Sequence, residues 1–295
     1  MADVATRSNV SALNPEFWSS IMQVPLRKSL VAGAVADTRF ESVLTMGDTV
    51  HYPYWDELSV TDYTPGTDIT GAEDVTGTDE SLTINQKKVV RFYVDDIEAM
   101  QAKYSFAMTL AEEGAYKLRD AIDTHILLNV TGAASALDDG DIGGTSGSAI
   151  TATSGNVADV YVQARRKMRQ MNVEDDGGWI SVVTPAFAAH IERMASDAGF
   201  SVADATLRNG FAGTYLGFRI YISNNLPSAA YGGTNSDYCY IGRQGQIHAV
   251  IQKAPTMIIR DAEKRLGRYF YPHTVYGSKV FEKHKYRFLK VPIEI

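Results

Sequence analysis

Histidine and acidic side chains are the groups in this sequence that could hold a metal ion or transfer a proton. The sequence contains six histidines, and no two of them stand in a His-x-x-x-His pair or a similar spacing that binds one metal ion. Adjacent acids such as Asp95 and Asp96 are typical of helix caps and turns before they indicate catalysis. The histidines are His51, His125, His190, His248, His273 and His284. We therefore predict structural or surface roles for them, without a metal site or a cofactor.

The segment 61–80 is rich in acids and could bind a hard cation. It contains six acids and no Lys or Arg, and calcium prefers carboxylate and carbonyl oxygens. The acids are too widely spread to match the Asp-x-Asp-x-Asp-Gly pattern of a calcium loop. A solvated loop is the favoured interpretation, with calcium binding as the alternative. Four of these acids are Asp62, Asp68, Glu73 and Asp74.

The glycine-rich segment and the single cysteine do not match nucleophile or phosphate-binding motifs. The glycines of the segment GGTSG, from Gly143 to Gly147, lack the Gly-x-Ser-x-Gly spacing of a nucleophile elbow. No Gly-Lys-Ser/Thr follows them, so they do not form a phosphate-binding loop. The single cysteine, Cys239, cannot form an internal disulfide and is better interpreted as a small buried side chain than as a nucleophile. The sequence does not indicate an enzyme.

A cluster of basic residues lies on a predicted helix that begins near Asn156. The cluster comprises Arg165, Arg166, Lys167 and Arg169. A solvated helix face is the favoured interpretation, and weak, non-specific contact with DNA is the functional alternative. The net charge of −7 argues against a dedicated nucleic-acid-binding protein, because such a surface needs an excess of Lys and Arg.

The composition is that of a soluble globular protein. Hydrophobic residues make up 45% of the 295 residues and charged residues 21%, which are ordinary values. The first residues lack the apolar core of a signal peptide, and the apolar run LVAGAVA is far shorter than the roughly 20 residues that span a bilayer. We expect no membrane association, and synthesis in the cytoplasm.

The N-terminal third predicts a small helix followed by a long hairpin. Asn14-Pro15-Glu16 is typical of a helix start, and Phe17 and Trp18 begin its apolar stripe. From Gly47 the pattern alternates, with Val50, Tyr52 and Tyr54 on one side, and the segment 81–93 alternates again. Two strands alone are marginally stable in water. The hairpin therefore needs a partner surface, either on its own body or on another subunit.

A long amphipathic helix follows the hairpin. Asp95 or Asp96 can cap it, and the helical spacing persists to about Asn129, over a length of roughly 50 Å. The predicted buried stripe consists of Ile97, Met100, Tyr104, Ala107, Met108, Ala111, Ala115, Leu118, Ile122 and Ile126. A helix laid across a sheet fits this single stripe better than a coiled coil does.

The remaining chain mixes helices and strands at short intervals. The Gly- and Ser-rich segment 131–155 predicts a loop or flexible link. After it, Asn156 is predicted to cap a helix with Val157, Val160, Tyr161 and Met168 facing inward, WISVVTP predicts a buried strand, and Pro185 opens another helix. The segment from Ala254 onward predicts sheet. This succession indicates an α/β or α+β fold.

The order of these parts resembles the major capsid protein of tailed bacteriophages, which has the α+β Hong Kong 97-like fold. The resemblance covers nearly the whole chain and rests on combination and order. In VRFYVDDIEAMQAKYSFAMTLAEEGAYKLRDAIDTHIL a strand runs through an acidic cap into the long helix, similar to the return of the family's extended loop and its spine helix. WISVVTPAFAAHI and LGFRIYISNNLP look like parts of the family's axial domain, and VYGSKVFEKHKYRFLKV resembles the closing strands of its peripheral domain.

The resemblance implies a division of the chain into four parts. Residues 1–46 would form an N-terminal arm and residues 47–93 the extended loop, a β-hairpin that lies over a neighbouring subunit. Residues 94–130 and 248–295 would form the peripheral domain with the spine helix, and residues 131–247 the axial domain. The loop segment 59–86 contains no lysine, so we do not expect the covalent cross-link through a loop lysine that one member of the family forms.

The function implied is that of a head-shell protein. Many copies would self-assemble as pentamers and hexamers into the icosahedral shell of a virion around packaged double-stranded DNA, after synthesis in the host bacterial cytoplasm. A separate scaffolding protein, a portal and a decoration protein are the implied partners. Residues 1–46 are too few to include a scaffolding-like helical extension. The expected intersubunit contacts are Phe17, Trp18, Arg27, Lys28, Tyr54, Trp55, Asp62, Asp68, Glu73, Asp74, Lys87 and Lys88.

Two alternatives remain open at the level of sequence. An encapsulin-like or gene-transfer-agent shell protein would share the fold and enclose different cargo. An α/β enzyme would need an acid, a base or a nucleophile gathered in one pocket, and the sequence names no such group. The acids of the segment 61–80 would face cations on a neighbouring subunit, and the candidates are Arg27, Lys28, Lys283 and Lys285.

Overall fold

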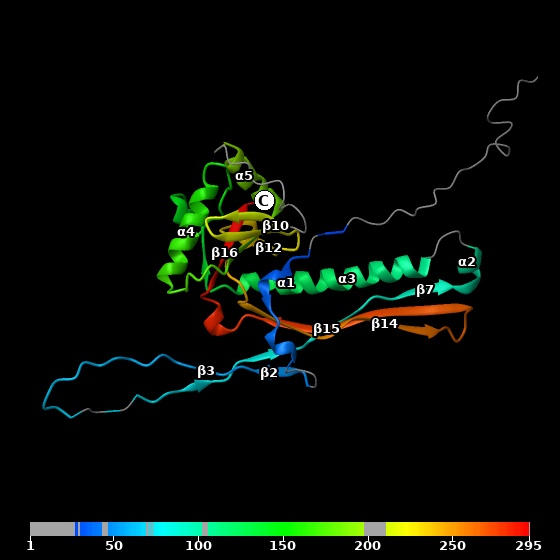
Figure 1. Ribbon diagram of the computed structural model, residues 1–295, viewed down its shortest axis with the longest axis horizontal. Helices are drawn as coiled ribbons and strands as arrows, with labels where there is room; N and C mark the ends of the chain where they lie inside the picture. The colour runs from blue at the N-terminus through cyan, green and yellow to red at the C-terminus, as the bar shows by residue number, and fades with distance from the viewer. Residues whose placement is uncertain are drawn as a thin grey trace, which may run out of the picture.

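The computed structural model of the chain describes residues 27–28, 30–42, 47–68, 71, 73–101, 106–197 and 211–294. These residues form a five-stranded sheet, a seven-stranded sheet and two ribbons of two strands each. Figure 1 shows the seven-stranded sheet with α4 and α5 at one end of the molecule and the five-stranded sheet extending beneath α3. The helices are α1 (Ala32–Val35), α2 (Asp96–Gln101), α3 (Phe106–Leu128), α4 (Val157–Gln170) and α5 (Pro185–Asp197), with short 3-10 turns η2 (Arg39–Ser42), η3 (Asn129–Gly132), η4 (Asp139–Ile142) and η6 (Glu282–His284).

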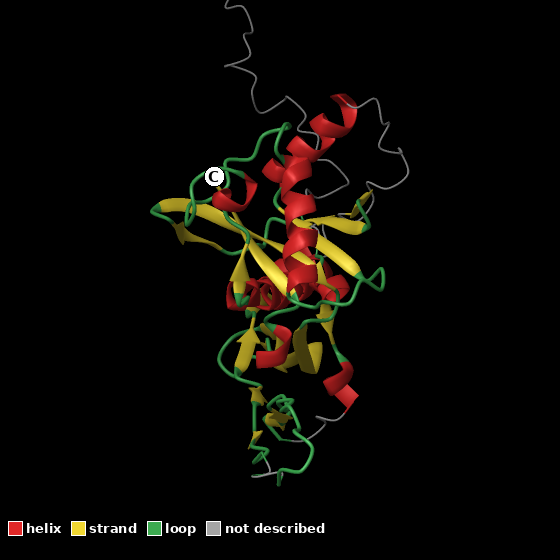
Figure 2. Ribbon diagram, turned by 90° about the vertical axis from the view of Figure 1, so that its left-hand side faces the viewer, coloured by secondary structure: helices red, strands yellow, loops and turns green. Residues whose placement is uncertain are grey.

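The five-stranded sheet is built mainly from the C-terminal part of the chain. Its order is β1 (Ala36–Asp37), β14 (Ile247–Asp261), β15 (Gly267–Lys279) and β6 (Gln86–Val89), and β7 (Phe92–Asp95) also pairs with β15. One face lies against α3, the long helix seen across the strands in Figure 2. The hydroxyl of Tyr276 donates to the carbonyl of Ala121 at 3.2 Å, and Ser278 Oγ lies 2.8 Å from His125 Nδ1. These bonds fix α3 along the sheet.

The seven-stranded sheet carries the larger core. Its order is β10 (Phe211–Tyr215), β11 (Phe218–Ile222), β9 (Trp179–Val183), β13 (Thr234–Arg243), β16 (Phe288–Glu294) and β8 (Ser135–Ala136), with β12 (Ser228–Tyr231) on β13. Phe288 of β16 is opposite Gly242 of β13. The range 248–295, assigned above to one domain, therefore contributes strands to both sheets, because its last strand pairs with β13.

Helix α4 packs on this sheet through the residues that the sequence predicted. Val157, Val160, Tyr161 and Met168 are fully buried. Asn156 is the N-cap residue of α4, as predicted, but its side chain makes no cap hydrogen bond. It contacts the preceding loop, where it accepts from the N–H of Thr153 and donates to the carbonyl of Thr151. The side chain is satisfied by that loop before it can reach the helix N-terminus.

The segment 131–155, predicted as a loop or flexible link, is tied to the seven-stranded sheet. Strand β8 pairs in parallel with β16, and Ile150 bridges Ile293. Asp138 and Asp141 form a reciprocal capping box around η4, and Asp138 Oδ2 also accepts the N–H of Gly147 at 2.7 Å. The Gly and Ser content serves these tight turns and does not produce a loose linker.

Two helices occupy the region of the predicted long helix. Asp95 caps α2, because its Oδ1 accepts the N–H of Ile97 at 2.9 Å. Residues 102–105, including Tyr104 of the predicted stripe, lie outside the described residues. In α3 the stripe is buried at Leu118, Ile122 and Ile126. Toward the N-terminus it is not: Met100, on α2, is 82% exposed, and Met108, near the start of α3, is 69% exposed.

The hairpin leaves the body of the molecule at the base of the five-stranded sheet. Strand β2 (Thr49–His51) pairs with β5 (Ser81–Thr83), and β3 (Tyr54–Trp55) pairs with β4 (Gly77–Thr78), both antiparallel. At the base, Val50, Leu82 and Ile84 pack with Val250 and Phe281. Beyond β3 the chain runs out from the body as the cyan loop at the lower left of Figure 1. We call residues 53–79 the arm; it is a different segment from the N-terminal arm expected in residues 1–46.

Candidate intersubunit surfaces

The arm exposes large apolar side chains. Val60 is 97% exposed and Trp55 72%, and Leu58, Tyr63 and Val75 are also largely exposed. Fully burying one such side chain stabilises a structure by about 1.5–3 kcal/mol. A group of exposed apolar residues on a projecting segment is typical of a surface that binds another protein.

Most acids of the arm point into solvent without a cationic partner among the described residues, and Asp79 is the exception, because its Oδ2 lies 2.5 Å from His51 Nδ1. Asp62, Asp68, Glu73 and Asp74 are all exposed. Glu73 accepts hydrogen bonds from the N–H and Oγ of Ser59 across the arm, and these bonds lower the pKa of Glu73. The other three make no hydrogen bond or ion pair with any residue that the structure describes. Their charge is available to a partner.

The base of the arm is fastened to the five-stranded sheet. Glu80 Oε1 lies 3.0 Å from Lys279 Nζ, and Glu80 Oε2 accepts the N–H of Glu282 at 2.8 Å. Lys283 Nζ lies 5.3 Å from the ring centroid of Tyr54, a geometry suited to a cation–π contact. These contacts fix the direction in which the arm leaves the body.

A buried pair of histidines lies beside the arm base. His248 Nε2 lies 3.4 Å from His284 Nδ1, and His284 Nδ1 lies 2.9 Å from Gln246 Oε1, which accepts its proton. His248 Nδ1 lies 3.5 Å from Asp37 Oδ2 and has no hydrogen-bond partner among the residues that the structure describes. Phe40, Tyr52 and Phe281 pack around the two imidazoles. Burial, together with the mutual repulsion of the charged forms, lowers the pKa of His248 to about 4, and burial also lowers that of His284 to about 4.

Sequence reasoning missed this histidine pair. The two residues stand 36 positions apart and belong to no spacing motif, and strand β14 and the turn η6 bring them together. For His248 the apolar neighbours Ile247, Ala249 and Val250 indicate burial, whereas His284 stands between Lys283 and Lys285 and carries no such signal.

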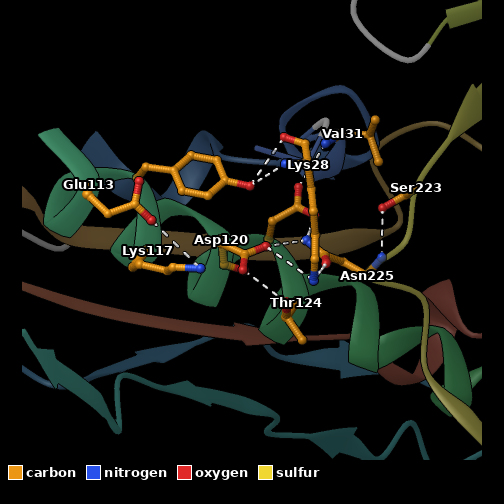
Figure 3. Close-up of polar contacts among 10 residues, drawn as sticks. Lys28, Val31, Glu113, Lys117, Asp120, Thr124, Ser223 and Asn225 are labelled. Atoms are coloured by element: carbon orange, nitrogen blue, oxygen red, sulfur yellow. Dashed lines mark hydrogen bonds and ion pairs between the residues drawn. The ribbon is translucent and has the colours of Figure 1, made fainter. Parts of the chain in front are cut away.

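A polar junction joins the segment before α1 to α3 and to the loop after β11 (Figure 3). Asp123 Oδ1 accepts the backbone N–H groups of Val31 and Ala32, and Asp123 Oδ2 accepts Asn225 Nδ2 at 2.9 Å. Lys28 Nζ donates to Asn225 Oδ1 at 2.8 Å and lies 4.0 Å from Asp120. Burial raises the pKa of Asp123. The junction holds Lys28, Val31 and Ala32 against α3.

The residues predicted to contact a neighbouring subunit occupy different environments in the structure. Arg27 lies 3.8 Å from Glu113 of its own chain, and Lys28 belongs to the polar junction. Tyr54 and Trp55 lie on β3, and Lys87 and Lys88 are exposed on β6. Phe17 and Trp18 lie outside the described residues. Their roles between subunits stay predictions.

The predicted DNA-facing cluster on α4 is largely neutralised by acids of the same chain. Arg165 and Arg169 both bind Asp175, at 2.9 and 2.7 Å, and Lys167 binds Asp141. Hydrogen bonds from Arg169 and Arg165 lower the pKa of Asp175 to about 2. Arg166 donates to Gln163 at 2.6 Å. A surface with its cations paired in this way attracts a polyanion weakly.

The described residues contain neither a metal cluster nor a membrane-spanning helix. No group of three or more His, Cys, Asp or Glu side chains in this part of the chain is placed to hold a metal ion. Across the same residues, none of the helices has the length and apolar character needed to cross a bilayer. Cys239 is fully buried, and burial raises the pKa of its thiol to about 12. A thiol in that state is a poor nucleophile.

Comparison with known proteins gives matches of structure and none of sequence. No protein-family model and no curated protein matches the chain. A structure from Mycobacterium phage Che8 has a TM-score of 0.77 and 24% identity, covering 94% of this chain and 96% of its own. The capsid of cyanophage P-SCSP1u gives a TM-score of 0.72 and 15% identity over 99% and 96% of the two chains. The capsid of Myoviridae phage XM1 gives 0.68 and 14% over 99% and 100%.

These likenesses run from one end of the chain to the other, so both sheets, the long helix and the hairpin are included in them. An identity of 24% or less over such a length is informative about architecture. The chain has the fold of phage capsid proteins.

Proposed function

We propose that this protein is the major capsid protein of a tailed bacteriophage, which self-assembles into the icosahedral head shell around the double-stranded DNA genome. The observation that carries the proposal is the likeness to phage capsid structures over nearly the full length of both chains. A coverage of this kind leaves little of the chain for an added catalytic domain. The protein acts as a structural subunit and not as an enzyme.

The exposed apolar arm supports a role in assembly. The fold of the subunit does not bury the side chains of Val60 and Trp55, because they lie outside its core. In a shell they become buried against a neighbour, and the arm serves as the extended loop. The exposed N-terminal part of the helical stripe, at Met100 and Met108, has the same need for a partner.

The two sheets define the two domains of the subunit. The five-stranded sheet with α3 forms the peripheral domain, with α3 as its spine helix, and the arm extends from it. The seven-stranded sheet with α4 and α5 forms the axial domain, to which β16 also belongs because it pairs with β13. Within the range 1–46 expected as the N-terminal arm, the described strand β1 pairs with β14 and so belongs to the five-stranded sheet.

The partners follow from this function. Copies of the chain form pentamers and hexamers, guided by a separate scaffolding protein and joined at one vertex by a portal. Contact with the packaged DNA is non-specific. The protein is made in the host bacterial cytoplasm and ends in the virion.

Electron microscopy tests the proposal directly. The chain expressed in bacteria, alone and together with its phage's scaffolding protein, should yield closed shells or capsomers. A protein that stays monomeric at every concentration under both conditions would refute it. Nucleic acid inside the mature particle, with terminase and portal genes beside the coding gene, separates a phage capsid from an encapsulin-like shell, which encloses protein.

A further inference from the structure

A small pocket opens beside the base of the arm, next to the buried histidine pair. It has a volume of about 250 Å³ and is lined by residues from distant parts of the chain. We call it the basic pocket and define it by Arg39 of η2, Tyr52 just after β2, Lys283 and His284 of η6, and Arg287 before β16. Its volume lies below the roughly 300–1,000 Å³ of pockets that bind drug-sized molecules. The basic pocket therefore suits a small ligand.

The walls of the basic pocket carry cations that are not neutralised. The side chains of Lys283 and Arg287 make no hydrogen bond or ion pair with any residue that the structure describes. Arg39 binds Asp37 through its Nε, and its terminal amino groups have no partner in the described part of the chain. Burial, and then the charges of Arg287 and Arg39, lower the pKa of His284 to about 4. The two guanidinium groups therefore lie close to this imidazole.

The acid that lines the basic pocket already has partners. Glu80 Oε1 lies 3.0 Å from Lys279 Nζ, and Glu80 Oε2 accepts the N–H of Glu282 at 2.8 Å. The carboxylate of Glu282 in turn binds Lys285. Cations that are held close together without an acid repel one another, and an anion between them relieves the repulsion. The basic pocket is thus arranged for a negatively charged ligand.

His284 adds a hydrogen-bond acceptor to these cationic donors. Its Nδ1 donates to Gln246 Oε1 at 2.9 Å, and the amide of Gln246 is oriented by its own donation to the carbonyl of Gln244. The proton of the neutral imidazole is therefore on Nδ1, so Nε2 is an acceptor. Nε2 makes no hydrogen bond with any described residue. A protonated oxyanion such as hydrogen phosphate can accept from the cations and donate its own proton to Nε2.

We propose that the basic pocket binds a small oxyanion of the phosphate type. Lys283, Arg287 and Arg39 surround the oxygens of the ligand, and His284 Nε2 accepts its proton. Guanidinium groups suit this ligand because their N–H groups match the geometry of phosphate oxygens. A free phosphate ion and a single phosphate of a nucleic-acid backbone share this chemistry.

A bound oxyanion connects three parts of the subunit. Arg39 belongs to η2, Tyr52 lies where the arm begins, and Arg287 precedes β16 of the seven-stranded sheet. A ligand that binds only the folded chain raises its free energy of unfolding. Phosphate therefore stabilises the subunit at the point where the arm leaves the body. This site goes beyond the shell function proposed above and does not depend on it.

Urea unfolding in sodium phosphate tests the site. At pH about 7, with sodium chloride holding the ionic strength constant, added phosphate should raise the midpoint of wild-type unfolding until the site saturates. Lys283→Gln with Arg287→Gln, both at exposed positions, should weaken the apparent phosphate affinity by about tenfold or more, because charge-assisted hydrogen bonds are lost. The matched control, Arg193→Gln with Lys264→Gln, removes the same two charges from exposed positions on α5 and after β14. It should respond as the wild type does.

Two further ligands identify what is bound. Sodium sulfate should give a smaller shift than phosphate, because sulfate has no proton for His284 Nε2. A short single-stranded oligonucleotide that competes with phosphate in the wild type, and not in the double variant, would identify a nucleic-acid phosphate as the source. A lack of competition would identify the free ion.

Two results would overturn the proposal. One is an equal shift from phosphate, sulfate and chloride, because that is a general effect of salt. The other is a Lys283→Gln, Arg287→Gln variant that responds to phosphate as the wild type and the control do. Each protein is compared with its own phosphate-free state, so a lower basal stability of the variant does not obscure the result. Particle formation tests the capsid function separately.

Discussion

Lys279 Nζ lies 3.0 Å from Glu80 Oε1, and this pair joins the last residue before β5 to the end of β15. The same lysine donates to the carbonyl of Ser81 at 2.8 Å, and the second oxygen of Glu80 accepts the N–H of Glu282. Glu80 belongs by sequence to the acidic segment 61–80. By position it is the anchor of that segment, whereas Asp62, Asp68 and Asp74 further along the arm make no hydrogen bond or ion pair with any described residue.

Removing the anchor should destabilise the subunit. Glu80→Ala removes a charge-assisted bond to the N–H of Glu282 and leaves Lys279 without its acid. Hydrogen bonds to charged groups contribute about 1.5–3 kcal/mol, and partial exposure of Lys279 reduces the ion-pair share. We expect a loss of about 1–2 kcal/mol in the free energy of urea unfolding. Asp74→Ala, which removes an unpaired acid, is the matched control and should change it by less than about 0.5 kcal/mol; equal effects would contradict the anchoring role.

The buried histidine pair predicts a stability that falls in mild acid. His248 and His284 have pKa values of about 4 in the folded chain, below about 6.5 for an unfolded histidine. Between these values the unfolded state binds more protons, so the free energy of unfolding rises with pH across this window and is lost as the pH falls. From pH 7 to 5, one such imidazole costs about 2 kcal/mol.

A substitution isolates this effect from other titrating groups. Asp37, Arg39, Glu80, Lys283 and Arg287 lie near the pair and supply the surrounding charge. His248→Phe keeps a ring among Phe40, Tyr52 and Phe281 and removes one titrating group. Urea unfolding at pH 7 and pH 5 should show a smaller loss in this variant than in the wild type. An identical loss in both proteins would assign the acid sensitivity to other groups.

Much of this fold could be predicted from periodicity. The alternation around Val50 and Leu82 predicted the paired strands at the hairpin base, and the inward positions of α4 were predicted residue by residue. Burial by tertiary partners could not be predicted in the same way. Met100 and Leu118 belong to one predicted stripe, but Met100 lies on α2 and is 82% exposed, whereas Leu118 lies on α3 and is buried. The periodicity of a helix shows which residues share a face, and not whether that face meets a partner.

The contacts of the candidate surfaces were less predictable. Charge in the sequence indicated Arg165 and Arg169 as free cations, but the loop after α4 folds back and brings Asp175 to both. Conversely, Lys87 and Arg260 lie far apart in the sequence, and only their pairing on opposite sides of β15 brings them onto one face. The sequence shows which charged residues are present. The course of the loops and the pairing of the strands decide which of them lie close together.

The polar junction predicts that a substitution at Asp123 loosens the chain locally, around Val31 and Ala32. Asp123→Ala removes the acceptor of the Val31 and Ala32 N–H groups and leaves both buried without a partner, which costs about 2–4 kcal/mol of unfolding free energy. Hydrogen exchange at these two amides should accelerate far more than exchange in β13, which the junction does not touch. Glu112→Ala, on the wet face of α3, serves as the control. Uniform acceleration over the whole chain would mean that the substitution weakens the fold in general and not this junction.

Shortening the arm should separate folding from assembly. Replacing residues 56–76 by a short Gly-Ser turn keeps β3, β4 and Glu80, and it removes no side chain of either core cluster. A change in loop length alters closure entropy by well under about 1 kcal/mol per doubling, so urea unfolding should stay within about 1 kcal/mol of the wild type. Shells or capsomers should nevertheless be lost in electron micrographs and in sedimentation, because the exposed apolar and acidic side chains of the arm are gone. A full-length arm of scrambled sequence is the control for length, and it should fail as the short arm does. Particles of normal number and heat stability from the shortened chain would show that the arm does not hold subunits together.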